Sequence, residues 1–112
     1  MANTFLNKKV DLTTTGVTTL YTVPSAATAI IKSILVSEDS GNADTITVTI
    51  TAGSDVFSLF KTKAVGANAT VELLTAPLVI EESEILKVTA ATANRLHVVV
   101  SALETQKRVV TT

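Results

Sequence analysis

The sequence contains no cysteine and no tryptophan, and only one of its 112 residues is histidine. The absence of cysteine excludes a disulfide framework and any metal site built on thiolates. Aromatic residues make up 4% of the chain and hydrophobic residues 46%, so the core must consist mainly of Val, Ile, Leu and Ala. We expect Phe57 and Phe60, joined by Phe5 and Tyr21, to be its few large side chains. Because an interface buries further apolar area at ~25 cal/mol per Å², such a thin core favours self-association.

Neither sign of charge is in clear excess, with nine Lys and Arg residues against ten Asp and Glu residues. The net charge is −1 at a pI of about 5.7, and the Lys and Arg residues are scattered along the chain. Without a basic cluster there is no surface suited to a phosphate backbone, so we expect no binding to nucleic acid. The four glycines, at positions 16, 41, 53 and 66, are too far apart to form a loop that cradles phosphate, which argues against nucleotide chemistry.

Long apolar runs are missing as well. The most apolar window, residues 26–36, is interrupted by Lys32 and is well short of the ~20 residues that span a bilayer. We therefore expect no membrane-embedded form. Residues 1–9 lack the apolar region of a signal peptide, so the sequence predicts synthesis in the cytoplasm without ordinary secretion.

The clearest positive signal is the segment 45–51, in which threonine alternates with Ile or Val. Successive side chains of a strand point to opposite faces, so Ile46, Val48 and Ile50 are predicted to line a core while the threonines face water. Threonine suits such a surface because its branched Cβ favours a strand and its hydroxyl stays hydrated.

Similar short segments recur about every ten residues and are separated by Gly, Pro, Asn and acidic turn residues. Strands are expected at residues 17–23, 29–37, 45–51, 56–63, 70–74, 76–80, 85–89 and 96–103. No strong helical periodicity competes with them. About eight short strands without helices between them predict an all-β protein, a single antiparallel β-sandwich of the jelly-roll or Ig-like type.

Two details of strand pairing follow from the pattern. Strict alternation along residues 29–37 predicts one face with Ile30, Lys32, Ile34 and Val36, and the other with Ile31 and Leu35. The turn residues 38–43 lead directly into the segment 45–51, so these two strands are predicted to form an antiparallel hairpin.

The chain divides into three parts. Residues 16–104 are predicted to form the sandwich domain, and residues 1–15 form either a first strand or an arm that lies on a neighbour. Residues 105–112 form a polar tail with a short β-prone end. This tail is expected either to fray or to pair with an exposed sheet edge of another subunit.

Few residues are candidates for chemistry. His97 alternates with Leu96 and Val98 and lies on the opposite face from them. A catalytic histidine needs a nucleophile and an orienting acid, which the sequence does not place beside it, so a structural role is favoured.

Two acidic segments could hold a cation. Glu81, Glu82 and Glu84 form a cluster that is interpreted as a solvated turn in preference to a cation site. Asp39, Asn42 and Asp44 supply oxygen ligands but lack the spacing of a calcium-binding EF-hand loop.

The remaining signals concern the surface. The triplet Asn68–Thr70 matches a glycosylation motif that has meaning only in a secreted protein. The threonine face is either plain exterior, a surface that contacts glycans or a surface for self-association, and plain exterior is favoured. Exposed aromatic residues that could stack on sugar rings are scarce.

Six strand-and-turn segments follow one another along the chain: Leu20–Pro24, Ala29–Val36, Gly41–Ile50, Ala69–Leu74, Glu84–Ala90 and Leu96–Glu104. This series spans about residues 17–104 and resembles the small structural proteins of tailed bacteriophages. One departure is the turn Glu82–Glu84, where a Gly-Asp turn is usual. The chain also lacks the repeats of a long fibre shaft, which makes a fibre less favoured.

The resemblance implies a non-enzymatic β-sandwich of the virion with no catalytic, cofactor-binding or metal-binding residues. It implies a capsid decoration (cement) protein that stabilises the head through contacts with the major capsid protein, often as a homotrimer. The terminal segments, residues 2–12 and 105–112, would then add strands or apolar anchors to the partners. A tail, baseplate or fibre accessory protein and a small carbohydrate-binding module remain the alternatives.

Overall fold

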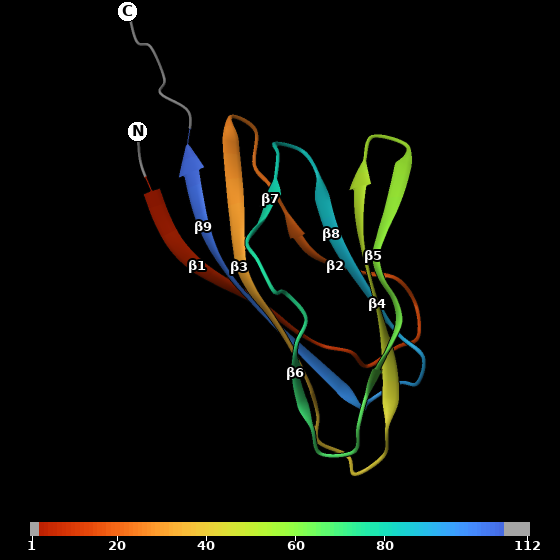
Figure 1. Ribbon diagram of the computed structural model, residues 1–112. Coiled ribbons are helices and arrows are strands. Elements are labelled where there is room, and N and C mark those ends of the chain that lie inside the picture. Colours follow the sequence, from red (N-terminus) through yellow and green to blue (C-terminus); the bar gives the residue numbers. More distant parts are fainter. Residues whose placement is uncertain (1–2, 107–112) are drawn as a thin grey trace, which may run out of the picture.

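The computed structural model describes residues 3–106, which form two antiparallel sheets packed face to face (Figure 1). Sheet A has the order β1-β9-β3-β6, with β7 also paired to β3. Its strands are β1 (Asn3–Asp11), β9 (Leu96–Gln106), β3 (Ala27–Glu38), β6 (Thr70–Glu72) and β7 (Leu78–Ile80). Sheet B has the order β2-β8-β4-β5. Its strands are β2 (Thr18–Thr22), β8 (Ile85–Ala90), β4 (Asp44–Ala52) and β5 (Asp55–Val65).

The strand order is that of a jelly roll. The first strand pairs with the last, β2 pairs with β8, β3 pairs with β6 and β7, and β4 pairs with β5, as in one long hairpin. This hairpin is rolled up so that β9 also pairs with β3, and β8 also pairs with β4. The predicted all-β sandwich is therefore confirmed, and of the two topologies expected the jelly roll fits. Residues 3–106 contain nine strands instead of the eight expected, because the segment predicted as a first strand or an arm forms β1.

The core lies between the two sheets and consists of aliphatic side chains, as predicted. Alternation along the strands buries Ile46, Val48 and Ile50 on β4, and Leu96, Val98 and Val100 on β9. No helix in residues 3–106 is long and apolar enough to cross a membrane.

The two ends of the sandwich gather different connections. The upper end in Figure 1 holds the start of β1, the end of β9, the β2–β3 and β7–β8 connections and the tip of the β4–β5 hairpin. The lower end holds the β1–β2, β3–β4, β5–β6 and β8–β9 connections. We use "upper end" and "lower end" in this sense below.

The prediction of strict alternation along residues 29–37 is wrong. Ile31 and Ile34 are both fully buried, because the register against β9 shifts between Ile31 and Ser33. Lys32 and Ser33 are therefore two adjacent residues opposite one residue of β9, which is a β-bulge. The bulge reverses the phase of alternation, so both halves of the long strand β3 present aliphatic side chains to the core.

The predicted hairpin between residues 29–37 and 45–51 is also wrong. β3 lies in sheet A and β4 lies in sheet B, so the turn at residues 39–43 carries the chain from one sheet to the other. The partner of β4 is instead β5, joined through the turn that contains Gly53 at φ +62°. In a jelly roll the chain must pass from one sheet to the other between β3 and β4. The residue types of the turn are the same for such a connection and for a hairpin turn, so they do not distinguish the two.

Of the four aromatic residues assigned to the core, only Tyr21 is fully buried there. Phe5 is 78% exposed and Phe57 56% exposed, while Phe60 packs partly buried against the core. The Tyr21 hydroxyl donates a hydrogen bond of 2.5 Å to Glu104 Oε1, and Lys8 Nζ lies 5.6 Å from the ring centroid. Burial, followed by the hydrogen bond and the charge of Glu104, raises the pKa of Tyr21. Tyr21 thus joins β2 of sheet B to β9 of sheet A at the side of the sandwich.

Both terminal segments contribute to sheet A. Residues 3–11 are β1 and pair along their whole length with β9. β9 continues to Gln106, so the expected boundary between residues 104 and 105 falls inside a strand, and Thr105 pairs with both Asn3 and Thr28. The rest of the predicted tail, residues 107–112, lies outside the described residues.

Candidate functional site

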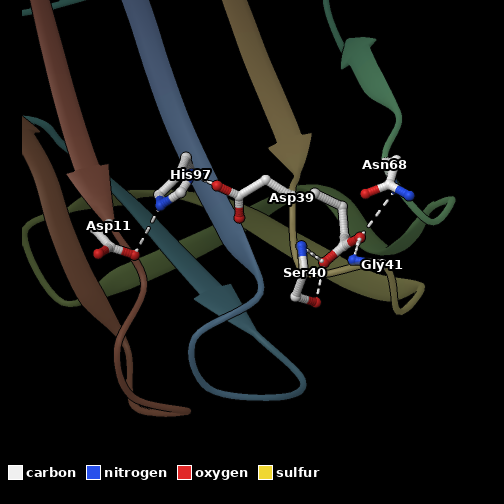
Figure 2. A network of polar contacts seen from close by, with 7 residues as sticks. Asp11, Asp39, Ser40, Gly41, Asn68 and His97 are labelled. Atoms are coloured by element: carbon white, nitrogen blue, oxygen red, sulfur yellow. Dashed lines mark hydrogen bonds and ion pairs between the residues drawn. The ribbon is translucent and has the colours of Figure 1, made fainter.

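The densest polar network lies at the lower end and centres on Glu38, the last residue of β3 (Figure 2). Glu38 is only 2% exposed. Its Oε2 accepts hydrogen bonds from the backbone N–H of Ser40 at 2.8 Å and from the Ser40 hydroxyl. Its Oε1 accepts from the N–H groups of Gly41, Asn42 and Asn68 at 3.0, 3.1 and 3.0 Å. One carboxylate thus fixes the β3–β4 turn and attaches it to the β5–β6 connection.

The hydrogen bonds keep Glu38 ionised. Burial raises the pKa of the carboxyl, but the bonds from Ser40, Asn68 and Gly41 outweigh burial and lower the pKa from 4.5 to about 2. Because a set of backbone amides surrounds the carboxylate, it needs no cation for its stabilisation. The Glu38 carboxylate therefore has a structural role: it caps the backbone N–H groups of the β3–β4 turn and of Asn68.

His97 lies beside this network and bridges two carboxylates. Its Nε2 is 3.1 Å from Asp11 Oδ1, and its Nδ1 is 3.5 Å from Asp39 Oδ2. Asp11 is the cross-strand neighbour of His97 in the β1–β9 pair, whereas Asp39 comes from the β3–β4 turn. The imidazole therefore connects an edge strand to the lower-end turn, as Figure 2 shows.

The geometry around His97 favours the structural role. A carboxylate faces each ring nitrogen, so neither nitrogen points at a group that it could activate as a nucleophile. The side chain is 38% exposed beside a hollow of about 270 Å³ lined in part by Lys9 and Val99. Asp11 and Asp39 are themselves 61% and 66% exposed, so the three groups form a surface bridge and not an enclosed reaction site.

The three residues of the predicted oxygen-ligand loop are not brought together as a ligand set. Asp39 faces His97, while the Asn42 N–H donates to Glu38. Asp44 is buried and accepts a 3.0 Å hydrogen bond from the N–H of Thr92 in the β8–β9 connection. Within residues 3–106 no group of three or more His, Asp or Glu side chains is placed to hold a metal ion.

The acidic cluster at the upper end forms a turn. Glu84 Oε1 accepts a 2.7 Å hydrogen bond from the N–H of Glu81, and the N–H of Glu84 donates back to the Glu81 carbonyl at 3.1 Å. Glu82 Oε2 accepts a 2.8 Å bond from the N–H of Ala26, which has φ +62°. These carboxylates satisfy backbone groups of the β2–β3 and β7–β8 connections.

Two further signals from the sequence have definite positions. Asn68 is exposed at φ +57°, where its N–H caps Glu38, so the motif Asn68–Thr70 is part of the lower-end network. The threonines of β4 lie on the outer face of sheet B and are half-buried, and Thr47 pairs with Thr89 of β8. The middle of this outer face is thus rich in threonine, with Lys87 and Ile85 of β8 beside it.

The outer face of sheet A has a different character. Register pairs align one residue from each strand into an apolar row that runs across the whole sheet, which we call the outer row: Phe5, Leu103, Ile30 and Val79. Phe5 and Val79, at its two ends, are 78% and 56% exposed, and the two central residues are half-buried. A parallel row nearer the lower end, which we call the second row, consists of Lys9, Val99, Leu35 and Glu72.

Between these two rows the surface dips. Asn7, Ser101 and Ser33 face outward there, and a hollow of about 310 Å³ lies beside Phe5 and Lys32. Glu72 seals the bulge of β3 by accepting hydrogen bonds from the Ser33 hydroxyl and, at 2.8 Å, from the N–H of Ile34. Partial burial raises the pKa of Glu72, but these bonds and those from the backbone of residues 73 and 74 outweigh it and lower the pKa.

Another apolar group is exposed at the upper end. Val56 and Phe57, just after the β4–β5 turn, are 62% and 56% exposed. Val56 pairs with Thr51 and Phe57 with Ile50, level with the first two residues of β8, so only residues 52–55 extend past that strand. Exposed apolar side chains beside a hairpin tip are typical of a contact site.

The role of Glu38 and the alignment of the outer row were not predicted from the sequence, although Phe5 and Ile30 were assigned other positions there. Both had a signal. The alternation that buries Ile34 and Val36 also turns Glu38 inward, and the amide-rich turn that follows supplies its donors. The outer row depends on strand register, which a sequence without known pairing does not reveal.

No protein-family model matches the chain, and no curated protein matches it either.

Proposed function

We propose that the chain is a non-enzymatic structural protein of a tailed-phage virion, most simply a capsid decoration protein. The observation that supports the proposal is the exposure of large apolar side chains at the upper end and on the outer face of sheet A. Such exposed groups are typical of surfaces that bind other proteins. The resemblance described above directs the proposal to virions.

The jelly-roll topology supports a virion role by analogy with other proteins of this fold. Jelly rolls occur in viral capsid proteins, lectins and cupins, so the fold by itself does not choose among these functions. In the proposed mechanism the β4–β5 tip, with Val56 and Phe57, contacts the capsid surface. Repetition of this contact over a symmetric lattice makes the overall attachment strong even if each contact is weak.

The first experiment is quantitative mass spectrometry of purified virions from a phage that encodes the chain, with heads and tails separated. The proposal predicts the protein in the head fraction in a fixed ratio to the major capsid protein. Its presence in the tail fraction alone would assign it to the alternative, a tail or baseplate accessory protein. Its absence from both fractions would refute a virion role.

The proposed contact can be tested on particles. Phe57→Asp should abolish reattachment of the purified protein to stripped heads, while Val17→Asp should leave it intact. Val17 is a matched control because it is 67% exposed but lies in the β1–β2 connection at the lower end. Equal reattachment of both variants would remove the hairpin tip from the mechanism.

One observation favours the carbohydrate-binding alternative. The exposed ring of Phe5 lies beside Asn7, Lys32 and Ser101, an arrangement of an aromatic face with polar groups that suits a sugar. A glycan array screened with the native protein and with Phe5→Ala tests it. Binding that depends on Phe5 would support this alternative over a capsid role.

A further inference from the structure

The outer face of sheet A differs from all other broad surfaces of the described sandwich. The central strand β4 of sheet B presents threonines on the outer face, and the inner faces of the two sheets are packed against each other. On sheet A, by contrast, the outer row places four apolar side chains side by side across the sheet. An apolar row of this kind is costly to leave in water, which indicates that something covers it.

The order of residues within the rows is self-complementary. A two-fold axis parallel to the strands reverses each row on a second copy, because β1 then lies over the β6 and β7 edge. In the outer row this operation puts Phe5 opposite Val79 and Leu103 opposite Ile30, so a large side chain meets a smaller one at both ends. A contact of this kind is isologous, since the same surface is used by both copies.

The charges obey the same symmetry. The second row begins with Lys9 on β1 and ends with Glu72 on β6, so the axis places Lys9 of each copy opposite Glu72 of the other. Within the described part of its own copy, neither Lys9 nor Glu72 forms an ion pair with an oppositely charged side chain. Lys9 Nζ donates a 3.2 Å hydrogen bond to Asn7 Oδ1.

The face is large enough for a specific contact. Four strand positions and nine residues of length give roughly 19 Å by 30 Å, or about 600 Å² per copy, from the usual spacings of a sheet. Two such faces bury about 1,200 Å², which is at the lower end of the range for stable protein interfaces. Sheets that pack face to face with strands nearly aligned are common in sandwiches.

We infer that the outer face of sheet A binds the same face of a second copy of this chain, about a two-fold axis parallel to the strands. The resulting dimer has four layers, with the two sheets B outermost. This inference does not depend on the virion role, because the contact involves only copies of this chain. It differs from the homotrimer that the resemblance implies.

Native mass measured by light scattering tests the contact. The wild-type protein is expected at twice the chain mass of 11.7 kDa, and Phe5→Asp and Val79→Asp are expected at the mass of one chain. Phe57→Asp and Val56→Asp are the matched controls, since they alter the same residue types at 56% and 62% exposure but lie off this face, and they should remain dimers. Far-ultraviolet circular dichroism should be the same for all four variants.

Cross-linking tests the direction of the axis. Since the chain has no cysteine, Phe5→Cys combined with Val79→Cys places the only two thiols at opposite ends of the outer row. Within one copy these positions are three strand spacings apart, ~14 Å, whereas across the proposed interface they face each other. A short bis-maleimide should give a covalent dimer on a denaturing gel with the double variant and not with Phe5→Cys alone.

Lys9→Glu tests the charge pairing. It would place two carboxylates opposite each other at both ends of the second row, and we expect it to weaken dimerisation roughly tenfold at low salt. A wild-type mass of one chain or of three chains would overturn the inference. So would a dimer that survives both Phe5→Asp and Val79→Asp, or efficient cross-linking of Phe5→Cys alone.

The two proposals fail separately. A dimer that is absent from virions would refute the virion role and leave the interface standing. A virion protein that is monomeric in solution and insensitive to substitution of Phe5 would refute the interface and leave the virion role standing.

Discussion

The connections at the two ends of this sandwich differ in their polar bonds and in the apolar side chains that they expose. At the lower end, Glu38, Asp44 and His97 connect loops that are far apart in the sequence, and each bond satisfies a backbone or charged group. At the upper end a few local bonds shape the turns, and Val56 and Phe57 remain in water. The comparison teaches that polar bonds between connections hold the lower end together, although Val17 is 67% exposed there, whereas the upper end has few such bonds and exposes the side chains that we propose as a contact surface.

The largest expected effect is on the closed lower end. Glu38→Gln removes the charge and replaces one acceptor oxygen by a donor, so the hydrogen bonds to that oxygen are lost: two from Ser40, or three from the N–H groups of residues 41, 42 and 68. We expect the melting temperature to fall by roughly 10 °C in a calorimetric scan. The control is Glu81→Gln at the exposed upper turn, which should change it by less than about 2 °C. Equal effects of the two changes would remove the distinction between the ends.

Acid should act on the lower end next. Since the pKa of Glu38 is lowered from 4.5 to about 2 in the folded protein, its contribution to stability is fully present above pH 4.5 and is lost as the pH falls toward 2. The lowered pKa of Glu72 acts in the same direction. Urea titrations between pH 6 and pH 2 should show falling stability for the native protein. The slope should be smaller for Glu38→Gln, and an identical slope would contradict the assigned role of Glu38.

A smaller effect concerns the left-handed residues of the two ends. The lower-end turn has Gly41 at φ +83°, whereas the upper connection has Ala26 at φ +62°. Gly41→Ala should lower the free energy of unfolding by about 1 kcal/mol, because a side chain strains this conformation. Ala26→Gly should raise it by up to about 1 kcal/mol for the same reason. Chemical denaturation measures the free energy of unfolding of both variants. Changes of the same sign would contradict the prediction.

The smallest effect on stability is expected at the exposed upper end. Val56→Asp and Phe57→Asp should change the free energy of unfolding by less than about 0.5 kcal/mol, since both side chains are more than half exposed. The same two-state denaturation curves provide the measurement. A loss of several kcal/mol would show that the hairpin tip belongs to the core and not to a contact surface.

Much of the fold could be predicted from alternation alone. The pattern of β4 placed Ile46, Val48 and Ile50 correctly in the core, because side-chain alternation is a local property of any strand. The bulge at Lys32 and Ser33 could not be predicted, since it depends on what the opposite strand presents. The turn at residues 39–43 likewise has the same composition whether it closes a hairpin or crosses between sheets.

The candidate site was less predictable than the fold. His97 was expected to be structural, and its bridge to Asp11 and Asp39 favours that interpretation, although neither partner is near it in the sequence. The exposure of Phe5 and Phe57 contradicts the expectation that scarce aromatic residues fill the core. Residue type alone misleads here, because the core is already filled by smaller aliphatic side chains.

The central position of β9 in sheet A has a consequence for biosynthesis. β9 lies between β1 and β3 and pairs with both. These two earlier strands therefore cannot be joined into one sheet until residues 96–106 have left the ribosome. Until then the nascent chain carries two unpaired strand edges and uncovered apolar faces, which makes it prone to aggregation. We therefore expect sheet A to form only after residues 96–106 have been synthesised, at a rate limited by the long-range pairing of β1 with β9.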